Sequence, residues 1–265
     1  MGLIDSHAHL TYPELFGQID GVLQRCETAG VERVITVGTD RADALAAVAL
    51  AERFPGRVEA AAGIHPHHAG EAIDADLRVM SGLWHSKRLV AVGEIGLDYH
   101  YDFADRGVQR AIFARQLELA AGLPYPLIIH CRDAFDDTCR LLQEHEFAGR
   151  RVVFHCFTGT EEEAARVAAC GWRLSFTGIV TFRNSRSLQA IAREYPGDQL
   201  MVETDSPFLS PEPVRGRKPN EPAHVVHIVR SLAALRSVSY EELARQTEEN
   251  TRRFFGISEG PLANP

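Results

Sequence analysis

The chain has 265 residues, of which 45% are hydrophobic and 24% are charged, so it can bury a large core and is neither disordered, collagen-like nor a coiled coil. Its 28 Lys and Arg residues against 36 Asp and Glu residues give a net charge of -8, which argues against a broad basic surface for nucleic acid. No long apolar run and no signal peptide are visible, and five cysteines without CxxC spacing fit reduced thiols. We therefore expect a cytoplasmic protein with no membrane contact.

Short β-branched or apolar runs alternate with longer amphipathic segments along the chain, a pattern typical of parallel strands joined by helices. The predicted strands are 3–9, 31–38, 58–65, 89–97, 126–132, 152–157, 172–178 and 200–205. The predicted helices lie near 14–29, 41–54, 73–86, 106–122, 134–146, 160–170, 185–195, 221–235 and 240–255. A proline-rich stretch, 206–222, is the one long irregular segment, and its length favours a functional loop.

Eight strand and helix units in a chain of this length predict an α/β fold of the closed (β/α)8 TIM-barrel type, as a single domain over residues 1–265. An open doubly wound sheet is the alternative architecture. That sheet would need a glycine-rich phosphate turn after its first strand, and neither GxGxxG nor GxxxxGK[ST] occurs in the sequence.

Polar residues gather at the C-terminal ends of the predicted strands, the face on which barrels build their active sites. In the first strand, the period of two puts Asp5, His7 and His9 on one face, pointing into the barrel mouth. With His7 and His9, the polar residues that end other strands make six candidate metal ligands: His7, His9, Glu94, His130, His155 and a carboxylate of the Glu203-Thr204-Asp205 segment. Four imidazoles and two carboxylates converging on a buried mouth need a compensating positive charge. Two divalent ions that share a bridging carboxylate and a bridging water would supply it, whereas six separately satisfied core residues are the alternative.

The order of the motifs makes the sequence recognisable. It contains DSHAHL at 5–10, GIHPH at 63–67, GEIGLDYH at 93–100, IHCRDA at 129–134, HCFTG at 155–159, ETDSPFL at 203–209 and RGRKPNEP at 215–222. Over essentially the whole chain it resembles the TatD family of metal-dependent hydrolases, within the amidohydrolase superfamily. The resemblance implies a TIM barrel and a divalent-metal-dependent nuclease activity, often a 3′ to 5′ exonuclease on single-stranded DNA or RNA. Carried over by motif, it also implies the metal ligands His7, His9, Glu94, His130, His155 and Asp205. Two aromatic residues usually follow the GLD block of the family, and here His100 replaces the second.

The expected chemistry is hydrolysis of a phosphodiester by a metal-activated water. Glu94 stands where many relatives are thought to use a carboxylated lysine, so we expect it to bridge the ions; a simple buried ion pair is the alternative. Asp205 ends the last strand and is the expected general base. Glu203 lies two residues earlier, and either orients a ligand histidine or is only solvated in the core.

Other residues are candidates for substrate contact. His65 ends the third strand and Arg132 follows His130 by two, so both could reach a phosphate. Arg132 could instead form a structural ion pair with Asp133 or Asp137. His67 and His68 are expected to be solvated, and strand alternation turns Cys131 and Cys156 toward the helices. Aromatic side chains in loops of the same face could stack on bases: Tyr99, Tyr101 and Phe157.

The one local basic cluster is Arg215, Arg217 and Lys218, which could hold the phosphates of an entering strand or form a solvated charge run. For cofactors we expect two divalent ions, with Mg²⁺ or Mn²⁺ supporting activity and Zn²⁺ or Ni²⁺ possible as bound, because imidazole ligands favour those metals. The expected enzyme is a monomer that acts on single-stranded DNA or RNA. A metal-dependent ester or amide hydrolase such as a D-aminoacyl-tRNA deacylase, and a non-catalytic metal-binding protein, are the alternatives.

Overall fold

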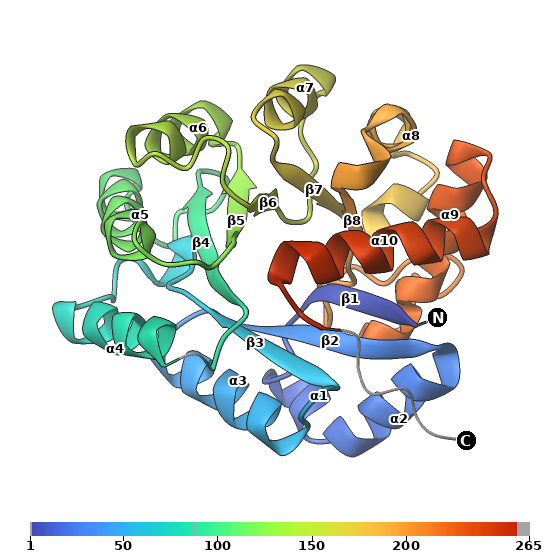
Figure 1. Ribbon diagram of the computed structural model, residues 1–265, viewed down its shortest axis with the longest axis horizontal. Helices are drawn as coiled ribbons and strands as arrows, with labels where there is room; N and C mark the ends of the chain where they lie inside the picture. The colour runs from blue at the N-terminus through green and yellow to red at the C-terminus, as the bar shows by residue number, and fades with distance from the viewer. Residues whose placement is uncertain (1, 87, 259–265) are drawn as a thin grey trace.

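The computed structural model describes residues 2–86 and 88–258, and within them eight parallel strands form one sheet in sequential order. The strands are β1 (Leu3–Ala8), β2 (Val31–Gly38), β3 (Val58–Ala62), β4 (Ala91–Asp98), β5 (Leu127–Arg132), β6 (Val152–Phe154), β7 (Arg173–Phe176) and β8 (Leu200–Val202). The sheet curves into a barrel with the helices outside it (Figure 1). The predicted (β/α)8 barrel is therefore confirmed.

The helices follow the strands in alternation and surround them. They are α1 (Pro13–Phe16), α2 (Ile19–Ala29), α3 (Arg41–Arg53), α4 (Asp74–His85), α5 (Arg106–Ala120), α6 (Phe135–Glu144), α7 (Glu161–Ala169), α8 (Arg186–Glu194), α9 (Val225–Arg236) and α10 (Tyr240–Phe255). None of the helices in the described part of the chain has the length and hydropathy needed to cross a membrane.

The barrel closes where the chain after β8 meets β1. The backbone N–H of Asp205 donates to the carbonyl of His7 at 3.0 Å, and that of His9 donates to the carbonyl of Ser206 at 2.7 Å. Ser6 Oγ adds a bond to the carbonyl of Val202 at 2.9 Å. Because these bonds join the two ends of the sheet, they hold His7, His9 and Asp205 at the same point of the barrel rim.

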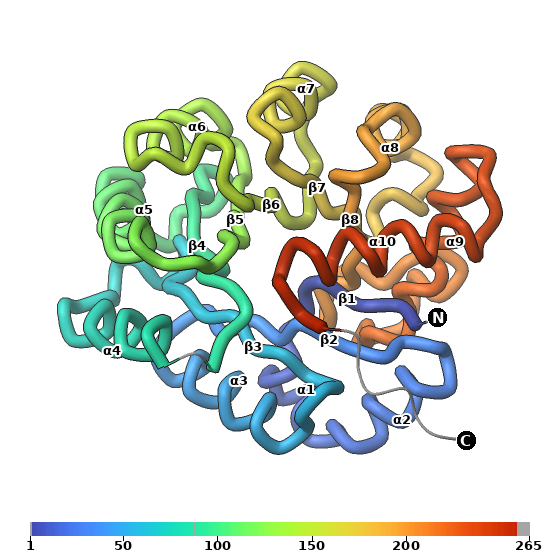
Figure 2. The backbone as a smooth tube through the Cα atoms, viewed as in Figure 1, coloured from blue at the N-terminus to red at the C-terminus, as the bar shows by residue number. Residues whose placement is uncertain are grey.

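An apolar cluster inside the barrel stabilises it. Inside it, one side chain from most strands forms a compact cluster that includes Ile35, Ile128 and Met201, and Phe254 and Phe255 of α10 join this cluster. Arg151, directly before β6, donates to the carbonyl of Phe254 at 2.6 Å. Helix α10 therefore covers the amino ends of the strands (Figure 2), and the carboxyl ends are left open for the site.

Several predicted boundaries differ from the structure. The segment predicted as one helix over 14–29 is broken at Gly17, and the helix predicted at 221–235 begins as a 3-10 turn, Pro222–His224, before α9. The predicted strands 152–157 and 200–205 end early, after Phe154 and Val202. The sequence pattern could not locate the ends of these two strands, because residues typical of a strand continue after the last hydrogen bond of the sheet.

Gly96 in β4 is required by its neighbour strand. Its φ is 144°, and an added Cβ would collide with the carbonyl oxygen of His130. We predict that Gly96→Ala lowers the free energy of unfolding by about 3 kcal/mol or more, since both the backbone conformation and the close approach are lost. Thermal unfolding should show a Tm lower by roughly 6 °C or more.

The matched control is Gly82→Ala. Gly82 lies within α4, and an added Cβ there meets nothing within 4 Å. The substitution should leave the Tm unchanged or slightly higher, because alanine is the better helix former. Equal effects of the two substitutions on the Tm would contradict the close approach of β4 and β5 at Gly96.

Candidate metal centre

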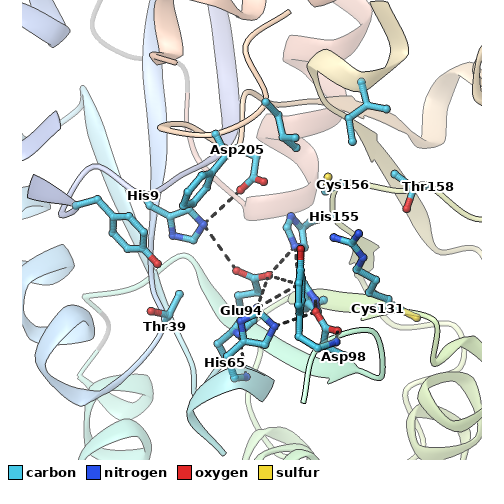
Figure 3. Close-up of a pocket in the computed structure, with 18 residues that line it drawn as sticks. His9, Thr39, His65, Glu94, Asp98, Cys131, His155, Cys156, Thr158 and Asp205 are labelled. Atoms are coloured by element: carbon cyan, nitrogen blue, oxygen red, sulfur yellow. Dashed lines mark hydrogen bonds and ion pairs between the residues drawn. The ribbon is translucent and has the colours of Figure 1, made fainter. Parts of the chain in front are cut away.

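The carboxyl ends of the strands surround a cavity of about 540 Å³. His9, His65, Glu94, His155 and Asp205 come from different strands or from the residues just after them, and all point into this cavity (Figure 3). The sequence-predicted ligands are thus brought to one place, on the face where the barrel was expected to carry its site.

A first group of ligand atoms lies around His7 and His9. Their Nε2 atoms are 3.4 Å apart, and Glu94 Oε2 lies 3.4 Å from that of His7. Asp205 Oδ1 lies 3.3 Å from His9 Nε2 and 3.9 Å from His7 Nε2. Ligands about 2.0 to 2.1 Å from a tetrahedral zinc ion are separated by about 3.3 Å. The spacing therefore fits one divalent ion held by four side chains.

A second group lies around the other oxygen of the same glutamate. Glu94 Oε1 is 2.7 Å from His130 Nδ1, 2.6 Å from His155 Nε2 and 3.4 Å from His65 Nε2. His130 Nδ1 and His155 Nε2 are 3.3 Å apart. Because each oxygen of Glu94 faces a different group, this side chain can bridge two ions, and both groups consist of the imidazole and carboxylate donors that divalent transition metals take.

Electrostatics at the site favour positive charge between the two groups. Burial would raise the pKa of Glu94, but the charge of His155 and hydrogen bonds from His130 and His155 hold it well below its usual range. Burial would lower the pKa of His155, yet Glu94 and Glu203 raise it well above. Burial dominates at His65 and lowers its pKa to about 3. The buried carboxylates thus need positive charge beside them, and bound metal ions would supply it.

Glu203 lies behind His155, as the sequence suggested for a residue that orients a ligand. Its Oε1 is 3.4 Å from His155 Nδ1 and accepts the backbone N–H of Cys156 at 2.7 Å. Its Oε2 accepts the hydroxyl of Ser175 at 2.6 Å. A carboxylate fixed on both oxygens can hold the His155 ring in one orientation.

The residue that the sequence reasoning missed is Asp98, at the end of β4. It is buried, and its Oδ2 lies 2.9 Å from both His130 Nε2 and His67 Nε2. Its Oδ1 accepts the backbone N–H groups of His100 and Tyr101 at 2.9 and 3.0 Å. The sequence did offer one signal for Asp98: it stands four residues after Glu94, at the end of the same buried strand. The prediction of a solvated His67 is wrong, because its ring bonds to the buried Asp98 and forms part of the cavity wall.

Two other sequence predictions are wrong for a geometric reason. Asp5 does not point into the barrel mouth: its carboxylate accepts the backbone N–H and the hydroxyl of Thr204. The pairing of β1 with β2 also shifts register between Asp5 and Ala8, so strict alternation does not hold there. Cys156 does not turn toward the helices, because the strand ends before it and its φ is 46°. Cys156 lines the cavity, whereas Cys131 borders the cavity but also packs against the hydrophobic core.

The candidate substrate residues divide into two sets. Arg132 lines the cavity, is exposed, and lies 5.1 Å from the centre of the Tyr101 ring. Tyr99 instead donates its hydroxyl to Asp137 at 2.6 Å and does not line the cavity. Phe157 is buried in the core. Of the aromatic candidates, only Tyr101 can meet a ligand in the cavity.

The basic cluster of the long loop lies outside the cavity wall. The guanidinium of Arg215 lies 3.8 Å from the centre of the Phe182 ring and pairs with Glu212 at 3.8 Å. Arg217 and Lys218 are exposed on the same loop. Contact between these three residues and a substrate would therefore occur beyond the metal ligands.

Comparison with known proteins decides the family. A family model described as "TatD related DNase" matches residues 4–256. The chain belongs to this TatD family. It is 37% identical over 256 residues to the metal-dependent hydrolase YabD of Bacillus subtilis, covering 97% of this chain and 100% of YabD. It is 36% identical over 259 residues to a 3′-5′ ssDNA/RNA exonuclease TatD of Erwinia billingiae, covering 96% and 99%.

Solved structures of the TatD family agree with the fold. The crystal structure of the TatD homologue YjjV from Escherichia coli superposes with a TM-score of 0.91 at 29% identity, covering 97% of this chain and 98% of YjjV. A TatD family hydrolase from Entamoeba histolytica gives 0.85 at 25% identity, covering 97% and 99%. The resemblance drawn from the motifs is thus confirmed, and this TatD protein is a metal-dependent hydrolase with the barrel of its family.

Proposed function

We propose that this protein is a two-metal nuclease that hydrolyses phosphodiester bonds of single-stranded DNA or RNA from the 3′ end. The observation that carries the proposal is the position of Glu94, whose two oxygens face two separate groups of imidazole and carboxylate donors. Two adjacent ions suit the in-line displacement at phosphorus, because the attacking and leaving oxygens are stabilised together.

The residues present fit transition-metal ions better than Mg²⁺ alone. The first group would be held by His7, His9, Glu94 and Asp205, and the second by Glu94, His130 and His155. Imidazole nitrogen is a good ligand for Zn²⁺ and Ni²⁺, whereas Mg²⁺ prefers oxygen, and Mn²⁺ accepts the carboxylates of both groups. We expect Zn²⁺ or Mn²⁺ in the purified protein and activity with Mn²⁺ or Mg²⁺.

When bound, the ions would lower the pKa of a coordinated water from about 15.7 toward about 7 and neutralise charge at the phosphoryl group. Asp205 Oδ1 lies at the cavity wall, and His9 holds it in its charged form, since its charge and hydrogen bond outweigh burial and lower the pKa of Asp205. Asp205 therefore takes the proton from the attacking water. Arg132 donates to a phosphate oxygen, and its planar fork suits that group.

The direct test uses oligonucleotides labelled at either end. Purified protein is stripped of metal, reloaded with Zn²⁺, Mn²⁺ or Mg²⁺, and incubated with 3′- and 5′-labelled single strands of DNA and RNA, with charged tRNA as a separate substrate. We expect stepwise loss from the 3′ end that chelation abolishes. Deacylation of the tRNA without cleavage of any strand would replace the nuclease by an ester hydrolase.

Arg132 and the loop cluster should differ in their kinetic effect. Arg132→Ala is expected to lower kcat by about 10²-fold, because a donor at the reacting phosphate acts in the transition state. Replacing Arg215, Arg217 and Lys218 together by Ala should mainly raise KM, the result of losing uniform binding. Both variants are measured on one labelled oligonucleotide.

A salt series on the same substrate separates the two effects further. Each phosphate contact contributes a slope of about -0.7 for single strands, so the triple loop variant should show a shallower dependence of KM on salt than the wild type. If the loop variant lowers kcat and Arg132→Ala changes only KM, the two roles have been assigned to the wrong residues.

A further inference from the structure

Phe208 is an exposed aromatic side chain at the wall of the metal cavity. It is 49% exposed, whereas the eight residues before it are buried or nearly so. It lines the cavity together with His9 and Asp205, and its ring centre lies 6.3 Å from that of His9. An apolar ring left facing solvent beside the candidate ligands is not needed by the core.

The backbone around Phe208 is fixed. Its N–H donates to the carbonyl of Asp205 at 3.0 Å, and its carbonyl accepts Nδ2 of Asn220 at 2.6 Å. Asn220 is fully buried and also donates to the carbonyl of Thr204 at 3.1 Å. The ring is therefore carried by a short hydrogen-bonded turn that begins at the proposed general base, which places it beside Asp205.

The ring itself is also held in one orientation. Tyr12 contacts it edge to face, with ring centres 5.8 Å apart and planes at 88°. Tyr12 in turn lies 5.0 Å from the His9 ring. Tyr12 thus packs against Phe208 on one side, and about half of the Phe208 surface remains exposed at the cavity wall.

We infer that Phe208 forms a nucleobase subsite, on whose face the base next to the scissile phosphate stacks, with Tyr12 supporting the ring. This inference rests on the proposed function and adds to it the residue that holds the base beside the first ligand group. Stacking suits a substrate of mixed sequence, because every base offers a π-face and no hydrogen-bond pattern is read. The negative net charge of the chain makes such an uncharged contact more important for holding the strand.

The test combines a protein variant with a substrate variant. Phe208→Ala and the wild type are assayed on an oligonucleotide with normal bases and on matched ones that carry a single abasic nucleotide at the terminal or penultimate position. We expect Phe208→Ala to raise KM about 10-fold on the normal strand, within the range for base stacking. At one of the two positions, the abasic nucleotide should raise KM of the wild type by a similar factor and should add little to the effect of Phe208→Ala.

Two further variants serve as controls. Phe208→Trp keeps a π-face and should restore KM to within about threefold of the wild type, which a merely structural role would not predict. Phe16→Ala removes a ring with nearly the same exposure, 47%, away from the cavity, and should change nothing. The stacking would be overturned if, at both positions, the abasic nucleotide raised the KM of Phe208→Ala by the same factor as it raises the KM of the wild type.

Failure of the proposed function can be told apart from failure of this inference. If the wild type cleaves no strand, binding of a 2-aminopurine oligonucleotide to the metal-loaded protein is followed by fluorescence. Quenching in the wild type and in Phe208→Trp but not in Phe208→Ala would support the subsite. The same quenching in all three proteins, or no binding by the wild type, would overturn it.

Discussion

Replacing Glu94 by glutamine is expected to lower the bound metal from about two ions per chain to one or fewer, and to reduce kcat on the order of 10³-fold. The reason is that each oxygen of Glu94 faces a different ligand group, at 2.6 to 2.7 Å in the second group and 3.4 Å from His7 in the first. A glutamine offers one neutral oxygen, and its amide nitrogen cannot bind a cation. Elemental analysis after gel filtration and turnover of a labelled oligonucleotide measure the two effects.

The fold of this variant has to be checked separately, because Glu94 is buried. Thermal unfolding and circular dichroism of the metal-free proteins show whether Glu94→Gln retains the barrel. Glu14→Gln, on the exposed side of α1, is the matched control and should keep both the metal and the activity. A folded Glu94→Gln protein with two ions and more than about a tenth of the wild-type kcat would contradict the bridging role.

Asp205→Asn should lower kcat by about 10²-fold or more, as the loss of a general base does. The amide keeps the size of the side chain and one oxygen near His9, but it cannot accept a proton. The rate deficit should shrink between pH 7 and pH 9, because hydroxide replaces the missing base at higher pH. Steady-state rates across this pH range measure the effect.

The control for this substitution is Asp20→Asn. Asp20 is 71% exposed and pairs with Arg53 on the surface, so its loss should change kcat by less than about twofold, since surface ion pairs contribute little. A deficit of Asp205→Asn that stays constant with pH would point to a ligand role alone. An unchanged kcat would remove Asp205 from the reaction.

The sequence predicted the architecture because its signals are local. Runs such as VERVITVG at 31–38 show no regular alternation of polar and apolar residues, which is typical of a strand buried on both faces. Eight such runs separated by amphipathic segments leave few topologies open. The polar residues at the strand ends were equally visible, since the carboxyl ends of all strands in a parallel barrel share one rim.

Contacts between loops and the residues of the barrel rim could not be predicted from local sequence signals. Tyr99 and Tyr101 are alike in sequence, but the hydroxyl of Tyr99 bonds to Asp137 while Tyr101 lines the cavity. Phe208 gave no periodic signal, and its exposure depends on a turn fixed by Asn220, twelve residues away. The role of Asp98 depends on its contacts with His67 and His130, which come from other parts of the chain.

By itself, the sequence thus determined the barrel, its family and the six candidate ligands, because strand period and motif order are properties of neighbouring residues. Only the tertiary structure decided which oxygen of Glu94 faces which histidines, and that Asp5 lies outside the cavity while His67 lies in its wall. The physical reason is that these outcomes depend on register and backbone turns. The register shift between Asp5 and Ala8 and the positive φ of Cys156 and Asp205 are backbone features that the strand period in the sequence does not predict.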